Sequence, residues 1–596
     1  MATYKAPLRD MRFVLNEVLD VETISSLPKF GEVTPDLIDA VLEEAAKIAE
    51  QVLFPINRSG DEEGCTFENG VVRTPAGFKE AYKTFVEGGW TNLSTDPTYG
   101  GQGLPATVGF VVEEMICSAN LAFGMYPGLS HGAYEAIRHH ANDDLKQAYL
   151  PKLGEGTWSG TMCLTEPHCG TDLGMLRTRA EPQADGSYAI TGTKIFISAG
   201  EHDLTENIIH LVLARLPDAP GGTKGISLFV VPKFLPTAEG KPGKRNGLGC
   251  GAIEHKMGIK ASSTCVMNFD GAKGWIVGEE NKGLNAMFTM MNAARLGVGM
   301  QGLGLAETAY QSAVAYAKDR IQGRSLSGPK APDKPADPII VHPDVRRMLL
   351  TQKSFSEGAR ALAYWVGMLI DVARHSQDTA KREEADDLLQ LLTPVIKAYF
   401  TDTGFESANL AVQVHGGHGY IREHGVEQLV RDARITMLYE GANGIQALDL
   451  VGRKLPMHGG RPMQKLLALL HGFVAENKGN AAMAEFVGPL EKAVNQMQAA
   501  VMWLMQNAMR NHEEAGGAAT DFLKVMALTV MAYMWARIAK AALDSNGKNG
   551  GEAEFYDAKL ATARFFVKRI LPQAEAHYSA LQSGVEPLMA LRAEAF

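Results

Sequence analysis

The sequence contains few cysteines and no excess of positive charge, and each of these absences excludes a class of protein. Six cysteines are spread over 596 residues, with no Cys-x-x-Cys pair and no pattern of a secreted disulfide framework. The 58 Lys and Arg residues are outnumbered by 68 Asp and Glu residues, which gives a net charge of −10. A chain of this charge lacks the basic surface that binds a nucleic-acid backbone. We therefore expect reduced thiols and no nucleic-acid partner.

Long apolar runs are also lacking. The longest apolar helical run, residues 525–536, lies between Lys524 and Arg537 and is shorter than the roughly 20 residues that a membrane span needs. It predicts a buried helix rather than an integral membrane segment. The first residues, Met-Ala-Thr-Tyr-Lys-Ala-Pro, contain no apolar core of a signal peptide. The expectation is a cytoplasmic protein.

Two kinds of periodicity divide the chain. Apolar residues recur every three or four positions from Pro35, after Thr34 as a candidate N-cap, and helical patterns continue through the first 150 or so residues. Alternating and β-branched runs at 188–197, 208–214 and 226–231 predict strands. Helical patterns return from Asn281, with a loop at 327–338 because four prolines cannot lie inside a helix.

These patterns predict a multi-domain protein that is mainly α with a central β domain. The glycine-rich, cationic run 240–250 is interpreted as a surface loop, and the run 457–462 as a break before a last helical block. The expected divisions are an N-terminal helical extension (1–34), a helical domain (35–157), a β domain (158–280), a helical bundle (281–456) and a C-terminal helical extension (462–596).

Three motifs contain residues suited to binding or catalysis. In the first, residues 162–172, Pro and Gly break the backbone while Thr165 and Thr171 add hydroxyls, so the loop can offer donors to an anionic or heteroaromatic ligand. A strand-end turn with local hydroxyl hydrogen bonds explains the same residues.

The second motif, Gln-Val-His-Gly-Gly-His-Gly-Tyr (413–420), follows a helical run. Its glycines allow a backbone to approach a phosphate closely, although a helix C-cap followed by a turn explains them equally well. No carboxylate-rich cluster accompanies His415 and His418, so no metal is expected.

The third motif, residues 431–446, contains one carboxylate, Glu440, between an apolar run and Gly441. Apolar surroundings favour the neutral form of a carboxyl group and move its pKa toward that of a useful general base. The alternative is an exposed Glu before a helix that begins at Asn443.

Taken in order, these and other motifs resemble the acyl-CoA dehydrogenase family over about residues 35–455. The matching motifs are Thr-Tyr-Gly-Gly-Gln-Gly-Leu (98–104), Leu-Thr-Glu-Pro with Gly-Thr-Asp (164–172), Gly-Thr-Lys-Ile-Phe-Ile-Ser-Ala-Gly (192–200), Met-Gly-Ile-Lys-Ala-Ser (257–262) with Gly-Glu-Glu-Asn-Lys-Gly (278–283), Asp-Arg-Ile-Gln-Gly-Arg (319–324), Gln-Val-His-Gly-Gly-His-Gly (413–419) and Tyr-Glu-Gly-Ala-Asn-Gly-Ile-Gln (439–446). The family has the same helical, β, helical order.

The resemblance implies the chemistry. FAD would be the cofactor, and Glu440 would remove the α-proton of an acyl-CoA while the β-hydrogen leaves as hydride to flavin N5. The backbone N–H of Glu440 and a flavin ribityl hydroxyl would polarise the thioester carbonyl. The product would be a trans-2-enoyl-CoA, with electrons passed to electron-transferring flavoprotein.

The resemblance also assigns binding residues by position. Phe196 stands where many members have Trp, and Ser198 where many have Thr, so an aromatic face and a hydroxyl are retained. Gln322 departs from the family pattern and is left unassigned. The expected cofactor-binding residues are Leu164, Thr165, Thr171, Phe196, Ser198, Arg320, Gln413, Gly416, Gly417 and Asn443. The expected substrate-binding residues are Thr171, Asn292, Arg295, Tyr439 and Gly441, with an ordinary surface arginine as the alternative for Arg295.

Assembly and substrate are less determined. The C-terminal extension resembles that of longer members, in which it takes the place of a second dimer, so we expect a homodimer. Fatty acid β-oxidation of medium or long chains is favoured, with 3-methylmercaptopropionyl-CoA as the alternative substrate. An acyl-CoA oxidase, a non-enzymatic acyl-CoA or FAD-binding scaffold and a DNA-associated member are further alternatives. The retained Glu440 argues against the scaffold, and the charge of −10 against the last.

Overall fold

The computed structural model describes residues 2–545 and 552–596, which form two compact units assembled from separated stretches of chain. Unit 1 comprises Met1–Ala46, Pro105–Ser118 and Val298–Phe596, and unit 2 comprises Lys47–Leu104 and Ala119–Gly297. The long helix α9 (Gly283–Asp319) begins in unit 2 and continues into unit 1.

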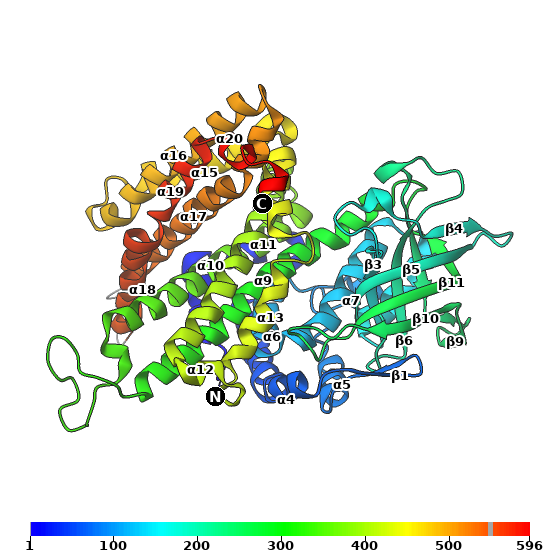
Figure 1. Cartoon of the computed structure of the whole chain (residues 1–596), viewed down its shortest axis with the longest axis horizontal. Helices are drawn as coiled ribbons and strands as arrows, with labels where there is room; N and C mark the ends of the chain where they lie inside the picture. The colour runs from blue at the N-terminus through cyan, green and yellow to red at the C-terminus, as the bar shows by residue number, and fades with distance from the viewer. Residues whose placement is uncertain (1, 546–551) are drawn as a thin grey trace. The chain divides into compact units, whose positions relative to one another are not determined.

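Unit 2 is built on a seven-stranded sheet with the order β3-β6-β7-β11-β5-β4, and β10 also pairs with β11. β3 runs parallel to β6, and the other pairs are antiparallel. Strands thus occupy the stretch where the alternating runs predict them (Figure 1). Their bounds are Trp158–Cys163 (β3), Arg179–Pro182 (β4), Tyr188–Ser198 (β5), Asn207–Ala214 (β6), Ser227–Pro232 (β7), Leu248–Ile253 (β10) and Thr264–Ile276 (β11).

One part of the sequence interpretation is wrong at 240–250. This run is not a simple surface loop, because β9 (Pro242–Arg245) pairs with β8 (Phe234–Pro236) and β10 begins at Leu248. The run lacks the alternating apolar residues that predict strands, and pairing with β8 and β11 stabilises its two strands.

Helices cover this sheet. α7 (Leu121–His140) packs on β3, and Gly160 permits the close approach because a Cβ there would lie 2.3 Å from the Cβ of Ala133. The other helices of unit 2 are α4 (Pro55–Glu63), α5 (Phe78–Glu87) and α8 (Asp143–Glu155).

A small hairpin, β1 (Thr66–Glu68) and β2 (Val71–Arg73), interrupts the stretch predicted as helical, so that prediction is wrong for these residues. The cause is the Asn69-Gly70 pair, whose φ angles of 51° and 78° form the left-handed two-residue turn that closes hairpins.

Unit 1 is an assembly of long helices. α9 packs directly against α11 (Thr379–His415), since a Cβ at Gly302 would lie 2.4 Å from the carbonyl oxygen of Phe400. α10 (Pro343–His375), α13 (Val426–Thr436) and α6 (Ala106–Ala119) complete the bundle. The predicted proline-rich loop lies between α9 and α10, and the predicted N-cap is confirmed, because Thr34 Oγ1 accepts the N–H of Leu37 at 3.2 Å before α3 (Pro35–Lys47).

The C-terminal part of unit 1 is also helical. It consists of α15 (Arg461–Asn477), α16 (Ala484–Ala508), α17 (His512–Ser545), α18 (Ala553–Phe565), α19 (Gln573–Gln582) and α20 (Glu586–Met589). α17 contacts α10 and α11 as well as its neighbours α16 and α19 (Figure 1), and Trp535 Nε1 donates to the carbonyl of Ser354 at 3.0 Å. α17 is long and apolar enough to cross a membrane, but 89% of its most apolar window is buried in the protein, as predicted for a core helix.

Candidate active site

The predicted base, Glu440, lies in the turn between α13 and α14 (Asn443–Asp449). Glu440 has a φ of 57° and Gly441 a φ of 88°, so two successive residues are left-handed. This conformation costs a non-glycine residue on the order of 1–2 kcal/mol and persists only where the surroundings hold it. Glu440 is half-buried. Strain at a partly accessible carboxylate is typical of a functional position.

Two buried side chains hold this turn. Lys397 Nζ on α11 donates to the carbonyl oxygen of Gly441 at 2.8 Å and to Asn443 Oδ1 at 2.9 Å. Gln446 Nε2 donates to the carbonyl oxygens of Glu440 and Gly441, at 3.2 Å each. Sequence reasoning missed both residues, although a lone Lys in the apolar run 395–400 was a signal, because a buried Lys requires a partner.

Tyr439 precedes the base and is anchored. Its hydroxyl donates to Gln301 Oε1 on α9, and burial raises the pKa of Tyr439 well above its usual value. The tyrosine therefore stays neutral. The structure brings the predicted residues Tyr439, Glu440 and Gly441 together in one fixed turn.

Asn443 has a different environment from the one the family position implies. Its Nδ2 donates to Asp402 Oδ1 at 2.6 Å and to Thr401 Oγ1 at 2.9 Å, while its Oδ1 accepts from Lys397. These bonds attach the start of α14 to α11.

The predicted flavin residues of unit 2 lie on β5 and on the loop after β3. Phe196 is 60% exposed with a φ of 57°, an outlier for an aromatic residue. The loop is tied to β5, because Ile195 N–H donates to the carbonyl oxygen of Thr165 at 2.9 Å and Lys194 Nζ donates to that of Leu164 at 3.0 Å.

Hydroxyl groups accompany this exposed ring. Within the described residues, the side chains of Thr165, Thr171 and Ser198 make no hydrogen bond. An exposed aromatic ring together with three available hydroxyls suits a planar heteroaromatic ligand with polar edges.

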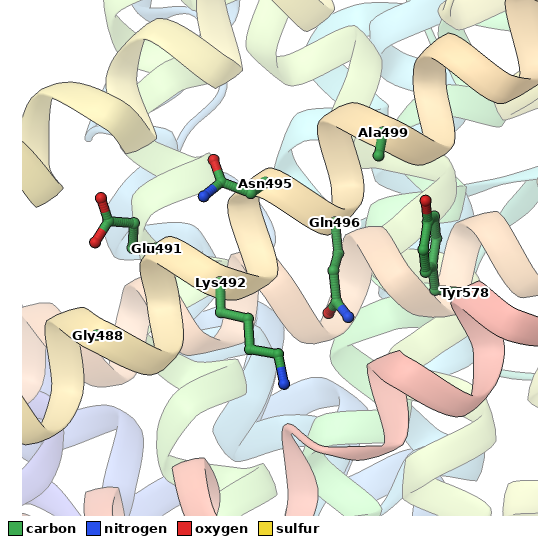
Figure 2. Close-up of a pocket in the computed structure, with 7 residues that line it drawn as sticks. All are labelled: Gly488, Glu491, Lys492, Asn495, Gln496, Ala499 and Tyr578. Carbon is green, nitrogen blue, oxygen red and sulfur yellow. The ribbon is translucent and has the colours of Figure 1, made fainter.

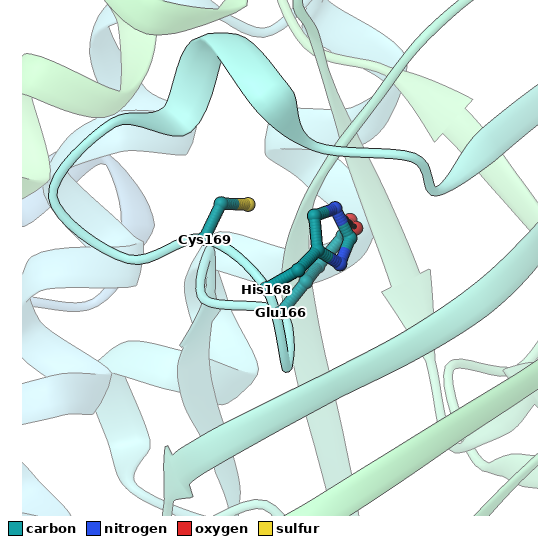
Figure 3. A group of neighbouring side chains, drawn as sticks. All are labelled: Glu166, His168 and Cys169. Atoms are coloured by element: carbon teal, nitrogen blue, oxygen red, sulfur yellow. Dashed lines mark ion pairs between the residues drawn. The ribbon is translucent and has the colours of Figure 1, made fainter.

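A buried ion pair supports the same loop. Glu166 accepts from Lys194 Nζ at 2.8 Å, from Thr178 Oγ1 at 2.6 Å and from the N–H of Arg177 at 2.7 Å. Burial opposes ionisation, yet Lys194 and these donors hold the pKa of Glu166 below its usual value. Figure 3 shows Glu166 beside His168 and Cys169, a grouping whose ligand atoms could suit a metal. Because both carboxylate oxygens already accept hydrogen bonds, we assign Glu166 to holding the loop.

Other predicted cofactor residues lie in unit 1. Arg320, at the end of α9, is exposed, and its side chain makes no hydrogen bond or ion pair within the described residues. Gln413 is exposed in the last turn of α11. Gly416 has φ 59° and ψ −136°, which only glycine adopts readily, and Gly417 follows it at the start of α12 (Gly417–Tyr420). An accessible cation and an uncovered glycine backbone suit a phosphate-bearing ligand.

Arg295 is not a surface arginine. It is 5% exposed, and its Nη1 lies 3.4 Å from Asn292 Oδ1, so the two predicted substrate residues contact each other on the first half of α9. Its burial excludes the ordinary surface position that was the alternative for this residue.

Two hollows of unit 1 contain none of the predicted residues. An open hollow of about 440 Å³ lies along α16. Figure 2 shows residues that line it, among them Glu491, Lys492 and Gln496 on α16 and Tyr578 on α19. A second, of about 100 Å³, is lined by residues of α10, α11, α17 and α19 that include Phe355, Tyr399 and Lys524. Neither adds to the candidate site.

The comparisons with known proteins agree with this geometry. Models of the acyl-CoA dehydrogenase N-terminal, middle and C-terminal domains match residues 36–157, 161–272 and 281–455, and an acetyl-CoA dehydrogenase C-terminal-like model matches 466–592. The chain belongs to the acyl-CoA dehydrogenase family. Membership gives the enzyme class, an oxidoreductase acting on a CH–CH bond of an acyl-CoA, and the cofactor, FAD.

Similar proteins extend over the whole chain. The 3-methylmercaptopropionyl-CoA dehydrogenase of Ruegeria pomeroyi is 44% identical over 98% of this chain and 99% of its own. The broad-specificity linear acyl-CoA dehydrogenase of Mycobacterium tuberculosis is 35% identical over 100% of both. The structure of Caenorhabditis elegans ACDH-11 with C11-CoA has the same fold, with a TM-score of 0.80 at 18% identity, covering 99% of this chain and 95% of that one.

Proposed function

We propose that this protein dehydrogenates linear acyl-CoA thioesters at the α,β bond, with Glu440 as the base that removes the α-proton. The observation that carries the proposal is the fixed left-handed turn that presents a half-buried carboxylate from an otherwise apolar run. Bound FAD supplies the acceptor for the β-hydride.

The residues of the chain divide the remaining work. The N–H of Glu440 can donate to the thioester carbonyl and so lower the cost of forming an enolate. Phe196 and the hydroxyls of Thr165, Thr171 and Ser198 would hold the flavin ring, while Arg320, Gln413, Gly416 and Gly417 would hold its nucleotide part. Asn292 and Arg295 would bind near the thioester and pantetheine arm, and Tyr439 and Gly441 are the other proposed substrate contacts. These roles follow the family positions together with the exposure described above.

We propose 3-methylmercaptopropionyl-CoA as the preferred substrate. The support is the relative from R. pomeroyi, which is 44% identical over nearly the whole length. The second candidate is a medium or long straight chain, as the sequence analysis favours, and the broad-specificity relative supports a linear chain.

An anaerobic titration distinguishes the two candidates. Pentanoyl-CoA is the matched control, since 3-methylmercaptopropionyl-CoA differs from it only by sulfur in place of one methylene. We expect the thioether substrate to bleach the flavin absorbance fastest, followed by pentanoyl-CoA, with octanoyl-CoA and palmitoyl-CoA slower. Faster bleaching by octanoyl-CoA would assign the enzyme to β-oxidation of longer chains, and no bleaching by any thioester would reject the dehydrogenase proposal.

The Glu440→Gln substitution tests the base. Loss of the proton acceptor should slow flavin reduction by at least about 10²- to 10⁴-fold while bound FAD is retained, because general-base catalysis contributes on this order. Stopped-flow absorbance at saturating acyl-CoA measures the rate. The control is Glu476→Gln, which removes an exposed carboxylate on α15 and should change nothing. Wild-type reduction in Glu440→Gln would remove the central assignment.

We further propose electron-transferring flavoprotein as the electron acceptor and a homodimer as the assembly, both from the family resemblance. Turnover with that flavoprotein should exceed turnover with O₂ by orders of magnitude, whereas comparable O₂ turnover would indicate an oxidase. Light scattering of the FAD-loaded protein gives the assembly, and a tetramer would contradict the homodimer.

A further inference from the structure

The turn that carries Glu440 is strained and has to be held from outside. Both Glu440 and Gly441 are left-handed, and the turn is only six residues long between α13 and α14. A Glu that relaxed to an ordinary right-handed conformation would redirect its carboxylate by several ångströms, since a backbone rotation at its own Cα moves the side chain. Base catalysis requires the carboxylate to stay within hydrogen-bond reach of the α-proton.

Lys397 meets this requirement from α11. Its side chain is 0% exposed, and its ammonium donates to the Gly441 carbonyl oxygen at 2.8 Å and to Asn443 Oδ1 at 2.9 Å. One donor group therefore holds a point directly after the base and a second point at the start of α14. These two hydrogen bonds together fix the conformation of the turn.

The surroundings fix Lys397 in turn. Asn443 is held by Thr401 and Asp402, which lie one turn further along α11 than Lys397. Asp402 also pairs with Lys524 of α17. The turn is thus anchored on α11, a 37-residue helix in the centre of the bundle, and not on a flexible loop.

Burying an ammonium group is costly, so a fully buried Lys needs acceptors. Two acceptors of Lys397 belong to the turn that carries Glu440, namely the Gly441 carbonyl oxygen and Asn443 Oδ1. The ammonium therefore directs its hydrogen bonds at the backbone directly after Glu440 and at the start of α14.

We propose that Lys397 is a positioning residue for α-proton abstraction, acting through the Gly441 carbonyl to keep the Glu440 carboxylate in place. The inference rests on the proposed function of Glu440. Lys397 does not take or give a proton in the reaction. Glu440 takes the α-proton to become a carboxylic acid while the electron pair stays on the substrate as the enolate. In turnover the β-hydrogen would leave as hydride to bound FAD, and the proton on Glu440 would pass to solvent. With a thioester that has no β-hydrogen, the acid returns a proton to the α-carbon.

The test measures proton abstraction separately from flavin reduction. The probe is 3-thiaoctanoyl-CoA, which has α-hydrogens but sulfur at the β position, so it cannot lose a β-hydride. The FAD-loaded enzyme is incubated with this probe in D₂O, and the exchange of its α-hydrogens for deuterium is monitored by proton NMR. Flavin reduction by the best substrate of the titration is measured on the same samples.

The main variant is Lys397→Met, which keeps an unbranched side chain one heavy atom shorter and removes its donors. We expect FAD content and KM to change by less than about threefold, while α-exchange and kcat both fall about 10²-fold, as misplacement by about 1 Å produces. The matched control is Lys454→Met, which removes an ammonium that donates to Gln390 Oε1 on the same helix α11 at 2.6 Å. It should behave as wild type.

A second variant keeps the test decisive if Lys397→Met does not fold. Gln446→Met removes the other donor to the Glu440 and Gly441 carbonyls and should lower α-exchange about tenfold with unchanged KM. Wild-type exchange in a folded Lys397→Met variant, or in Gln446→Met where Lys397→Met fails to fold, would overturn the positioning role. Absence of exchange and of bleaching in the wild-type enzyme itself would instead show that the proposed function is wrong.

Discussion

At the scale of single residues, the turn that contains Glu440 depends on a glycine whose backbone conformation strains any residue with a side chain. Gly441 has a φ of 88°, and a Cβ there would lie 2.5 Å from Gln446 Nε2, the group that holds the turn. Gly441→Ala therefore combines backbone strain with displacement of a buried amide. We expect a loss of about 1–3 kcal/mol in the free energy of unfolding and at least a tenfold loss of kcat.

A neighbouring glycine provides the control for this prediction. Gly444 lies in the first turn of α14, and a Cβ there would meet nothing within 4 Å. Gly444→Ala should stabilise the protein by up to about 1 kcal/mol, since Ala is the better helix former. Urea unfolding and steady-state rates on both variants measure the contrast. Equal behaviour of the two variants would mean that the left-handed turn is not a requirement.

Residue-scale prediction from the sequence was uneven for a physical reason. A motif marks Glu440 and its neighbours Tyr439 and Gly441, and their roles stay predictions, although the structure shows the left-handed turn that contains them. Lys397 was not found, although a Lys among apolar residues signals a buried partner. Which partner it has depends on how α11 packs against α14, about 45 residues later in the chain, and one-dimensional patterning does not contain that contact.

At the scale of elements, one buried arginine connects helices from distant parts of unit 1. Arg360 on α10 is 1% exposed and binds Glu114 on α6 at 2.6 Å, Glu307 on α9 at 2.9 Å, and Asp10 on α1 (Leu8–Arg12). Lys559 on α18 binds the same Asp10. The N-terminal and C-terminal extensions are thereby joined to the bundle by one ionic network.

Removal of this arginine should be costly. Arg360→Met leaves three buried carboxylates without their common partner, and we expect a loss of about 3–5 kcal/mol in the free energy of unfolding. Arg564→Met is the control, because its pair with Glu485 is solvent-exposed and contributes at most about 1 kcal/mol. Urea denaturation followed by circular dichroism measures both. A loss below 1 kcal/mol for Arg360→Met would show that the network is dispensable.

The elements themselves were predictable where their periodicity is local. The strands between 158 and 276 and the core helix around residues 525–536 follow directly from alternating and apolar runs. The hairpin at Thr66–Arg73 was missed because its strands are only three residues each, although the Asn69-Gly70 turn signal was present. Short strands contribute too few residues to show a period against a helical background.

At the scale of the whole molecule, the order of helices along the chain differs from their grouping into compact units. α6 belongs to unit 1, whereas the helices before and after it, α5 and α7, belong to unit 2. Periodicity assigns each helix a type but not a unit, since the unit depends on which buried faces meet. The four family models therefore match consecutive stretches of sequence, whereas the two units group the residues that pack together.

Unit 2 should be the acid-sensitive part of the molecule. Burial and the nearby charge of Lys233 lower the pKa values of His202, in the segment between β5 and β6, and of His210, in β6, to about 3 each, so both imidazoles are neutral when folded. Unfolded histidines titrate near 6.5, so between pH 6.5 and about 3 the unfolded state binds more protons than the folded state. The stability of unit 2 must then fall as pH falls, by up to about 1.4 kcal/mol per pH unit for each histidine.

Amide hydrogen exchange of β6 measures this loss of stability. The exchange rates are recorded as a function of urea concentration at pH 7, 6, 5 and 4.5, and each rate is corrected for intrinsic exchange. In His210→Gln one titrating group is gone while an amide can still bond Thr161, so the slope below pH 6.5 should drop by about half. His471→Gln, on the exposed side of α15, serves as the control and should keep the wild-type slope. If His210→Gln also keeps it, His210 is protonated in the folded protein, and the acid sensitivity of the sheet has another source.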